Sequence, residues 1–477
     1  MRSSPRSWLR QHGFWIFWNR RSVNKTPSSS TGESIRRLGA RVTKDDLKIV
    51  LGRWDSVAIV IAIVIGVGIF RVPSEVATYI KSPWLIMVAW LAGGLISLVG
   101  ALCYAELAST FPETGGNYVY LKKSYGPLTA FLFGWSELLV IRAGSLAAVA
   151  FIFAEYLASF LGADKLLVKP FAVFSIVLLG VVNIAGLRQS KRTQNFFVVV
   201  KLLALVALIF LGFISGEGDY GRFRMSFEGG GGDTLYFFGV ALIPILWTYG
   251  GWHENVFVAG ETINARTTLP FALVTGIVSV IVLYLGANAL YLYLFPPEAI
   301  QRTDIVAAKV FTLLHTRYGR KIFESVVIVS SIATINSMIM TGSRITYAMA
   351  RDLRYFRYFN RLSKRQATPY RAIIVLAVWS VLLVLWGTFN RLLYFAGFLV
   401  WIFFALVVAG LIILRYKYPD KKRPYAVWGY PFLPAAFMMV SFALAVVSFA
   451  SHVQTSLAGL AILAAGLPLY YFSKRKE

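Results

Sequence analysis

The stretch Gly66-Val67-Gly68-Ile69-Phe70 interrupts an apolar segment that extends over residues 54–79. A second interruption, Gly250-Gly251-Trp252, divides the apolar segment 235–260. Each segment is long enough to cross a bilayer, which takes about 20 helical residues. A break exposes backbone N–H and C=O groups, and these are tolerated at membrane depth only where they line a polar cavity. Paired breaks in corresponding halves of a chain indicate the substrate site of a membrane transporter.

The composition is that of a protein with many membrane spans. Of the 477 residues, 57% are hydrophobic and 15% are charged, whereas soluble domains carry about 25% charged residues. The net charge is +26, but the basic clusters lie between apolar segments, and this distribution argues against nucleic-acid binding. Cys103 is the single cysteine, so no intrachain disulfide can form.

The sequence predicts an all-α polytopic membrane protein with about twelve transmembrane helices. We expect them at residues 54–80, 84–110, 128–161, 168–186, 193–215, 235–261, 269–294, 322–351, 371–389, 392–416, 430–450 and 454–473. An even number places both termini on one side, and the basic clusters indicate that this side is cytoplasmic. The expected location is therefore the plasma (inner) membrane. Residues 295–321 would form an external connection that can cover the site.

Each broken segment begins a set of five spans. Residues 54–215 are expected to form a first five-helix repeat and residues 235–416 a second, which is inverted because an odd number of spans reverses the direction of the chain. Around them we expect a basic cytoplasmic tail at 1–53, an external loop at 216–234, and helices 11 and 12 with a short cytoplasmic C-terminus at 417–477. The halves share no clear residue identity, so this prediction depends on pattern alone.

The two breaks offer complementary groups to a ligand. At the first, Gly66 and Gly68 let the backbone leave helical geometry, and free amides beside a positive helix end suit a carboxylate. These amides belong to Val67, Gly68 and Ile69. At the second, ahead of Gly250, carbonyls that end a half-helix suit an ammonium group; they belong to Trp247, Thr248 and Tyr249. Together the groups fit the zwitterionic head of an α-amino acid. The alternative for each glycine pair is close helix packing.

Several charged residues lie within the apolar spans. Lys201 in the fifth span must find buried partners, because a cation in hydrocarbon is costly. The alternative is that its side chain extends to the cytoplasmic surface. Glu137 and Arg142 in the third span raise the same question, and Glu106 in the second is either a gating or a packing residue.

Several motifs resemble those of the amino acid–polyamine–organocation carriers, and of their L-type amino acid transporter branch in particular. They are Gly66 to Phe70, Cys103 to Leu107, Phe111 to Tyr120, Trp135 to Arg142, Lys201 to Leu205 and Tyr249 to Trp252. The resemblance runs in order from about Leu51 to Phe472. It implies the leucine-transporter-type fold, a 5+5 inverted repeat with helices 1 and 6 broken, and sodium-independent exchange of L-amino acids.

The resemblance also implies roles for single residues. It implies that Val67–Ile69 bind the carboxylate of the substrate and that the carbonyls of Trp247–Tyr249 bind its amine, as above. Trp252 matches an aromatic gate beside the substrate, and Lys201 matches a lysine that replaces the sodium ion of related carriers. Ser331 and Asn336 lie in the eighth span, where the family lines its site; their match is looser.

The chain departs from the branch at two places. Glu254 is an unusual acid so near the break: it would favour cationic substrates, take part in proton coupling, or face the scaffold with a partner. The loop 161–169 lacks the cysteine that members linked to a heavy chain use, so a disulfide-linked heavy chain is not expected.

The sequence therefore predicts a secondary active transporter that exchanges L-amino acids, chiefly neutral ones, without sodium. The alternative is a proton-coupled or cationic amino acid or polyamine carrier of the same fold. An enzyme is not expected, because the chain has no cluster of histidine, cysteine and acidic residues with metal-ligand spacing. A channel is disfavoured because no ring of pore charges is present. We expect no cofactor and no metal.

Overall fold

The computed structural model describes residues 47–223, 232–303, 305–314, 318–353, 355–387, 389–451 and 453–473. The first 46 residues of the predicted N-terminal tail lie outside the described residues, as do the last four of the predicted C-terminus and residues 224–231 of the predicted external loop. Within the described ranges the chain is helical, and its one isolated β-bridge pairs Leu51 with Thr262.

The first half of the chain forms the spans around the first break. Their bounds are α2 Arg53–Val64, α3 Gly68–Tyr79, α4 Pro83–Thr110, α6 Pro127–Ser136, the π-helical turn η2 Glu137–Ile141, α7 Arg142–Leu161, α8 Val168–Ala185 and α9 Leu187–Ile214. A short helix, α5 Asn117–Tyr125, connects α4 to α6. Because η2 joins α6 to α7 without leaving the helix axis, these three segments together make one long apolar span, 127–161.

The second half follows the same plan with longer connections. Its helices are α10 Gly232–Thr248, the 3-10 segment η5 Trp252–Glu261, α11 Ala265–Leu294, α12 Pro297–Gln301, α13 Val306–Leu314, α14 Gly319–Asp352, α15 Tyr370–Trp386, α16 Phe389–Lys417, α17 Phe432–Ser451 and α18 Val453–Ser473. The predicted external connection contains α12 and α13. The segment after the second break is a 3-10 helix, where the sequence predicted an α-helical half.

The prediction of an all-α polytopic membrane protein is confirmed. In the described residues, ten helices are long and apolar enough to cross a membrane, and α2 with α3 makes an eleventh span bent by 44° at the break. The shorter apolar helix α15 lies where the ninth span was expected. The total of twelve spans and the inverted repeat stay predictions.

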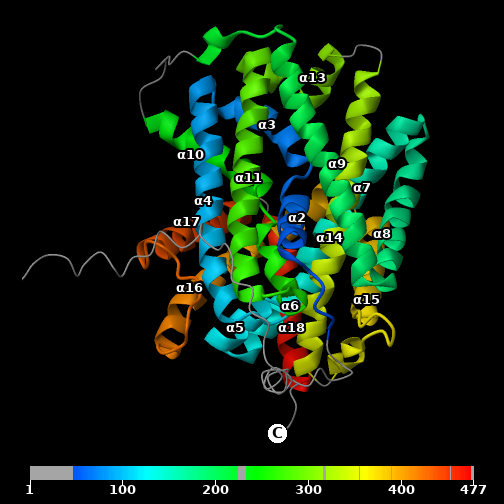
Figure 1. The fold of residues 1–477 in the computed structure, drawn as a ribbon, viewed down its shortest axis with the longest axis vertical. Coiled ribbons are helices and arrows are strands. Elements are labelled where there is room, and N and C mark those ends of the chain that lie inside the picture. Colours follow the sequence, from blue (N-terminus) through cyan, green and yellow to red (C-terminus); the bar gives the residue numbers. More distant parts are fainter. Residues whose placement is uncertain are drawn as a thin grey trace, which may run out of the picture. The chain divides into compact units, whose positions relative to one another are not determined.

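The first broken helix lies among the other helices and not at the lipid-facing surface. Most of α2 is buried, as expected for a helix that is apolar on all sides. It packs against α9, α11, α14 and η5, whereas α10 packs against α3 and α4. Figure 1 shows α2 in the interior, with α3 and α13 toward one end of the molecule and α5 and α18 toward the other. We call these the α13 end and the α5 end.

Candidate substrate-binding site

The first break provides free backbone donors. The Gly66 amide donates to the Val64 carbonyl at 2.8 Å, so the α-helical pattern stops there, and α3 begins at Gly68. The first amides of a helix have no partner within it. Among the described residues no acceptor is found for the amides of Val67, Gly68 and Ile69. Since this end of α3 also carries about half a positive charge, the break can bind an anion.

Lys201 is buried and its side chain forms hydrogen bonds to the backbone at the first break. Its Nζ donates to the carbonyls of Ala62 at 2.8 Å and Ile65 at 2.5 Å. The same two carbonyls accept hydrogen bonds from α14: Thr334 Oγ1 donates to Ala62 at 2.9 Å and Ser330 Oγ to Ile65 at 3.2 Å. The side chain therefore does not extend to the surface. It connects α9 to the broken helix. The break leaves these two carbonyls without a donor from their own helix, and Lys201 supplies one.

Ser331, which the resemblance placed in the lining of the site, does not take part in this connection. Ser330 and Thr334 are four residues apart and share one face of α14, whereas Ser331 is turned about 100° from Ser330 around the helix. Ser331 Oγ is buried, has no partner among the described residues and lines a cavity instead.

The second break is a tight turn. The Gly250 amide donates to the Trp247 carbonyl at 2.9 Å, and Gly251 has φ 99°, a left-handed conformation that favours glycine. The Thr248 and Tyr249 carbonyls come just before this turn. Each carbonyl oxygen has two lone pairs, so a carbonyl that accepts one hydrogen bond can still accept a second from an ammonium group.

The two breaks are in direct contact. A Cβ on Gly68 would lie 2.8 Å from Thr248 Cγ2, and a Cβ on Gly251 would collide with the Ile63 side chain of α2. Each break thus needs a glycine where the other approaches it. Close packing and an open backbone, which the sequence left as alternatives, occur here together.

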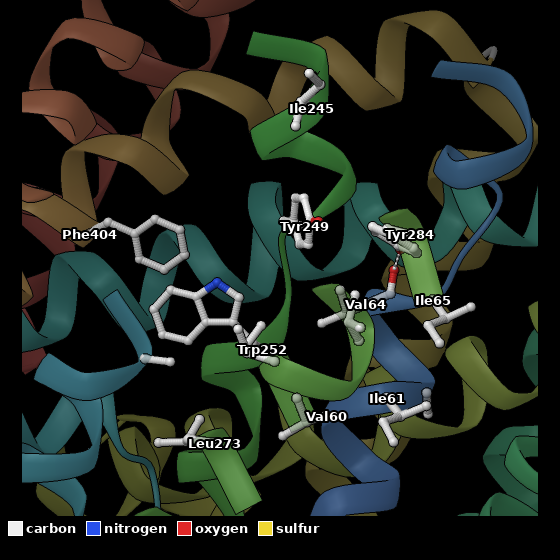
Figure 2. Close-up of a cluster of buried hydrophobic side chains, with 14 of the residues drawn as sticks. Val60, Ile61, Val64, Ile65, Ile245, Tyr249, Trp252, Leu273, Tyr284 and Phe404 are labelled. Atoms are coloured by element: carbon white, nitrogen blue, oxygen red, sulfur yellow. Dashed lines mark hydrogen bonds between the residues drawn. The ribbon is translucent and has the colours of Figure 1, made fainter. Parts of the chain in front are cut away.

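Tyr284 of α11 connects the two breaks, and the sequence analysis did not identify it. Its hydroxyl donates to the Val64 carbonyl at 2.7 Å and lies 3.3 Å from the Thr248 carbonyl. Figure 2 shows this bond beside the apolar side chains that surround the breaks. The sequence contains no specific signal for this contact, because the same span contains other hydroxyl groups, such as those of Ser279 and Tyr291.

A cavity of about 200 Å³ lies between the two breaks and helices α7, α14 and α16. It is smaller than pockets for drug-sized ligands, which span about 300–1,000 Å³, so its size suits one small molecule. The predicted site residues that line it are Gly66, Val67, Gly68, Trp247, Thr248, Gly250, Ser331 and Glu254. We call it the smaller cavity.

Trp252, expected as the aromatic gate, does not line the smaller cavity as the described residues form it. Its ring stacks on Phe404 at 5.6 Å between centroids, with 9° between the planes, as Figure 2 shows. Trp252 directly follows the left-handed turn at Gly251, and the next residues, His253 and Glu254, line the cavity in its place. Trp247, on the other side of the turn, is 45% exposed and lines the cavity, so it is the tryptophan of this segment beside the ligand space.

Three further predicted residues also point elsewhere. Asn336 is buried in a hydrogen-bonded group with Asn183, Ser190 and Gln194 of α8 and α9, which makes it part of the scaffold. The Tyr249 ring packs on Tyr284 at 4.9 Å and the Ile69 side chain is buried. For these two, only the backbone groups remain candidates for ligand contacts.

A larger cavity, of about 1,100 Å³, lies beyond the smaller one and is lined by α3, α7, α10, α13 and α14. Helices α3 and α13 place it toward the α13 end (Figure 1). The two cavities share the lining residues Val67, Gly68, Ile152, Trp247, Gly397 and Trp401. The smaller cavity is therefore next to a wide space on one side.

A buried ion cluster forms one wall of the smaller cavity. The Arg142 guanidinium lies 2.5 Å from Glu254 and 3.2 Å from Glu137, and Thr341 donates to Glu254 at 2.9 Å. Arg142 and Glu254 both line the cavity. Glu254 is therefore paired, and it also faces the ligand space; the sequence analysis had treated these as alternatives.

Comparison with known proteins identifies the family. A family model described as "Amino acid permease" matches residues 51–467. The chain belongs to the amino acid permease family. Being a permease, it is a membrane transporter and not an enzyme, as the sequence predicted.

Named relatives agree with this assignment. The permease is 30% identical to the b(0,+)-type amino acid transporter 1 of Oryctolagus cuniculus over 79% of this chain and 78% of the relative. It is 30% identical to the cystine/glutamate transporter of Homo sapiens, over 87% of this chain and 83% of the relative. It is 28% identical to the serine/threonine exchanger SteT of Bacillus subtilis, over 91% of this chain and 99% of the relative. The resemblance to the amino acid–polyamine–organocation carriers is thereby confirmed.

The permease is closed at the α5 end by ion pairs. Arg344 of α14 pairs with Glu261 at 2.7 Å, and both side chains are 1% exposed. Glu106 of α4 accepts from Arg415 at 2.6 Å and from the Val427 amide at 2.7 Å. These bonds connect η5 to α14, and α4 both to α16 and to the segment that follows α16. Glu106 therefore has the partners of a closing residue.

Proposed function

We propose that this permease exchanges L-amino acids across the membrane without sodium. The observation that supports the proposal is the smaller cavity, which is lined by Val67 and Gly68 of one broken helix and by Trp247 and Thr248 of the other. The relatives named above are an amino acid transporter, a cystine/glutamate transporter and a serine/threonine exchanger. All are carriers of molecules with an α-amino acid head group.

The head group would bind between the breaks. Its carboxylate would accept hydrogen bonds from the amides of Val67–Ile69, and its ammonium group would donate to the carbonyls of Thr248 and Tyr249. The side chain would then extend along Ser331 and the ion cluster. Trp247 and Trp401, which line both cavities, would separate a bound ligand from the larger cavity.

Lys201 supports transport without sodium. A fixed ammonium group supplies the positive charge that joins the carbonyls of α2 to the scaffold, and its bonds make a metal ion unnecessary there. Hydrogen bonds to a charged donor contribute about 1.5–3 kcal/mol each. Binding of a second solute is therefore not needed to fix the broken helix.

A second candidate, of the same fold, is a carrier of cationic amino acids or one coupled to protons. The buried carboxylate of Glu254 at the cavity wall favours it. Uptake of an unlabelled neutral substrate that acidifies the lumen of the vesicle would support proton coupling, and strict one-for-one exchange at constant pH would exclude it.

We further propose a location in the plasma membrane with both termini in the cytoplasm, because the basic loops lie on the side of the chain ends.

The single cysteine, Cys103, is buried, which supports the absence of a disulfide-linked heavy chain. Migration on a gel as the same species with and without reductant is the expected result; a higher band without reductant would contradict it.

The test is counterflow in proteoliposomes. Vesicles that contain the purified permease and are preloaded with unlabelled L-serine or L-leucine should take up the radiolabelled amino acid in sodium, potassium or choline buffer alike. Methyl esters and N-acetyl derivatives, which block one end of the head group, should fail to compete. Equal competition by the blocked forms, or a requirement for sodium, would overturn the proposal.

A further inference from the structure

Each of the three nitrogens of the Arg142 guanidinium contacts a carboxylate, which leaves two of its five N–H donors without a carboxylate partner. Its Nε and Nη2 each lie 3.2 Å from Glu137 Oε2, and its Nη1 lies 2.5 Å from Glu254 Oε2. The same oxygen, Glu254 Oε2, also accepts a hydrogen bond from the Thr341 hydroxyl at 2.9 Å. All three charged side chains are at most 5% exposed. A rigid, buried arrangement of this kind holds its charges in place.

The cluster has one carboxylate too many for charge neutrality. As ionised groups, Glu137 and Glu254 contribute −2 and Arg142 contributes +1, which leaves −1. Among the described lining residues, the ionisable side chains of the smaller cavity are Arg142, Glu254 and His253. No lysine or other arginine of that lining pairs with these carboxyl groups, so Glu254 is the acid that this wall presents to a ligand.

Two other polar groups of the same cavity have no partner. Ser331 Oγ and His253 Nδ1 are buried without a hydrogen bond from the described residues, and both residues line the cavity. Buried polar atoms normally have partners. These two residues line the same cavity as Arg142 and Glu254, which indicates that a polar ligand group binds in this cavity.

We propose that Glu254 sets the charge selectivity of the permease, which accepts neutral and cationic side chains and refuses anionic ones. This rests on the proposed function, because the amino acid head group must bind between the breaks for its side chain to reach the wall. Glu254 acts in two ways. It occupies the arginine that an anionic side chain would need, and it leaves a net negative charge that attracts an ammonium or guanidinium group.

The native protein gives the first test. Uptake of a radiolabelled neutral L-amino acid into preloaded proteoliposomes is measured with increasing L-lysine, L-arginine or L-glutamate as competitor. The cationic amino acids should compete at concentrations at least about tenfold lower than L-glutamate, a ratio that corresponds to about 1.4 kcal/mol. Competition by glutamate as good as that by lysine would overturn the proposal. Absence of any amino acid uptake would instead overturn the proposed function.

Substitution of Glu254 gives the second test. Glu254→Gln keeps the shape, removes the excess charge and releases Arg142 Nη1, so the lysine-to-glutamate preference should fall at least about tenfold. Glu254→Asp, which keeps the charge, should retain the native order. Glu155→Gln removes the same charge from the larger cavity and should leave the preference unchanged. A Glu254→Gln protein with the native preference would overturn the proposal.

A binding measurement covers the case in which Glu254→Gln does not fold. The purified native permease should be protected against heat denaturation by L-lysine and by neutral L-amino acids at concentrations where L-glutamate gives no protection. Equal protection by L-glutamate would contradict the assignment of Glu254.

Discussion

Gly66 and Gly68 lie two residues apart but have different surroundings. A Cβ on Gly68 would meet three atoms of Thr248 at 2.8–3.1 Å, whereas a Cβ on Gly66 would have the Val64 carbonyl, at 4.0 Å, as its nearest neighbour. Neither position has a positive φ. The two glycines therefore differ in the space around them. Gly68 allows close packing against Thr248, whereas Gly66 leaves room for a ligand.

We predict that Gly68→Ala lowers both stability and transport, because its methyl group forces α3 away from α10. Gly66→Ala should keep the native melting temperature, since its methyl group extends into the smaller cavity, and should weaken substrate binding. Thermal unfolding in detergent and uptake kinetics distinguish the two. Equal melting temperatures for both variants would show that α3 and α10 can separate without cost.

Lys201 is the buried charge on which the broken helix depends. Lys201→Ala removes two hydrogen bonds from a charged donor, each worth about 1.5–3 kcal/mol, and should reduce transport at least about tenfold. Lys191→Ala is the matched control, because Lys191 lies on the same helix in a partly exposed ion pair with Asp55, and exposed pairs contribute about 0–1 kcal/mol. Uptake in sodium and choline buffers is the measurement. Full activity of Lys201→Ala would contradict the role.

At the scale of elements, the glycine pattern was sufficient to predict two interrupted spans and the groups they expose. It could not predict where side chains next to a break point. Trp247 lies three residues before Gly250 and Trp252 directly follows Gly251, and nothing in the sequence indicates that the more distant tryptophan lines the cavity. For the same reason Ser330 and Ser331 could not be distinguished without the rotation of α14. Contacts between distant helices, such as that of Tyr284, leave no local signal.

Tyr284 joins α11 to both breaks, and a pair of substitutions tests this connection. Tyr284→Phe removes the hydroxyl that donates to the Val64 carbonyl and should cost about 0.5–1.5 kcal/mol of stability. Tyr291→Phe is the control: Tyr291 lies two turns further along α11, and its buried hydroxyl has no partner among the described residues. The expected result is a lower melting temperature for Tyr284→Phe alone. A loss of the same size in both variants would contradict the connecting role.

At the scale of the whole molecule, the α5 end is closed and the larger cavity lies at the α13 end. Three connections hold the closed end around η5 and α4: the Arg344–Glu261 pair, the Glu106–Arg415 pair, and the backbone bond of 2.9 Å from the Leu51 amide to the Glu261 carbonyl. Transport by alternating access requires these connections to break while the cavity at the α13 end closes. The strength of these connections therefore sets the equilibrium between the state that is open at the α13 end and the state that is open at the α5 end.

We predict that Glu261→Gln shifts the permease toward the state that is open at the α5 end. A lone buried Arg344 is strongly destabilised in the closed state, and opening returns it to water. A cysteine placed at Val240 in the larger cavity, in a Cys103→Ser background, should react more slowly with an impermeant thiol reagent. Asp352→Asn, which disrupts a partly exposed pair with Lys122, should have a smaller effect. Unchanged labelling in Glu261→Gln would contradict the prediction.

The position of Lys201 has a consequence for the energy source of transport. An ammonium group that belongs to α9 cannot leave with the substrate, so this position contributes no transported charge. Exchange of one neutral amino acid for another is then electrically silent and driven only by their concentration ratios. Exchange of a cationic amino acid for a neutral one moves one charge, to which the membrane potential contributes about 2.3 kcal/mol per 100 mV. In a polarised cell such an exchanger would import cations and release neutral amino acids, and a recorded current would reveal which substrate occupies it.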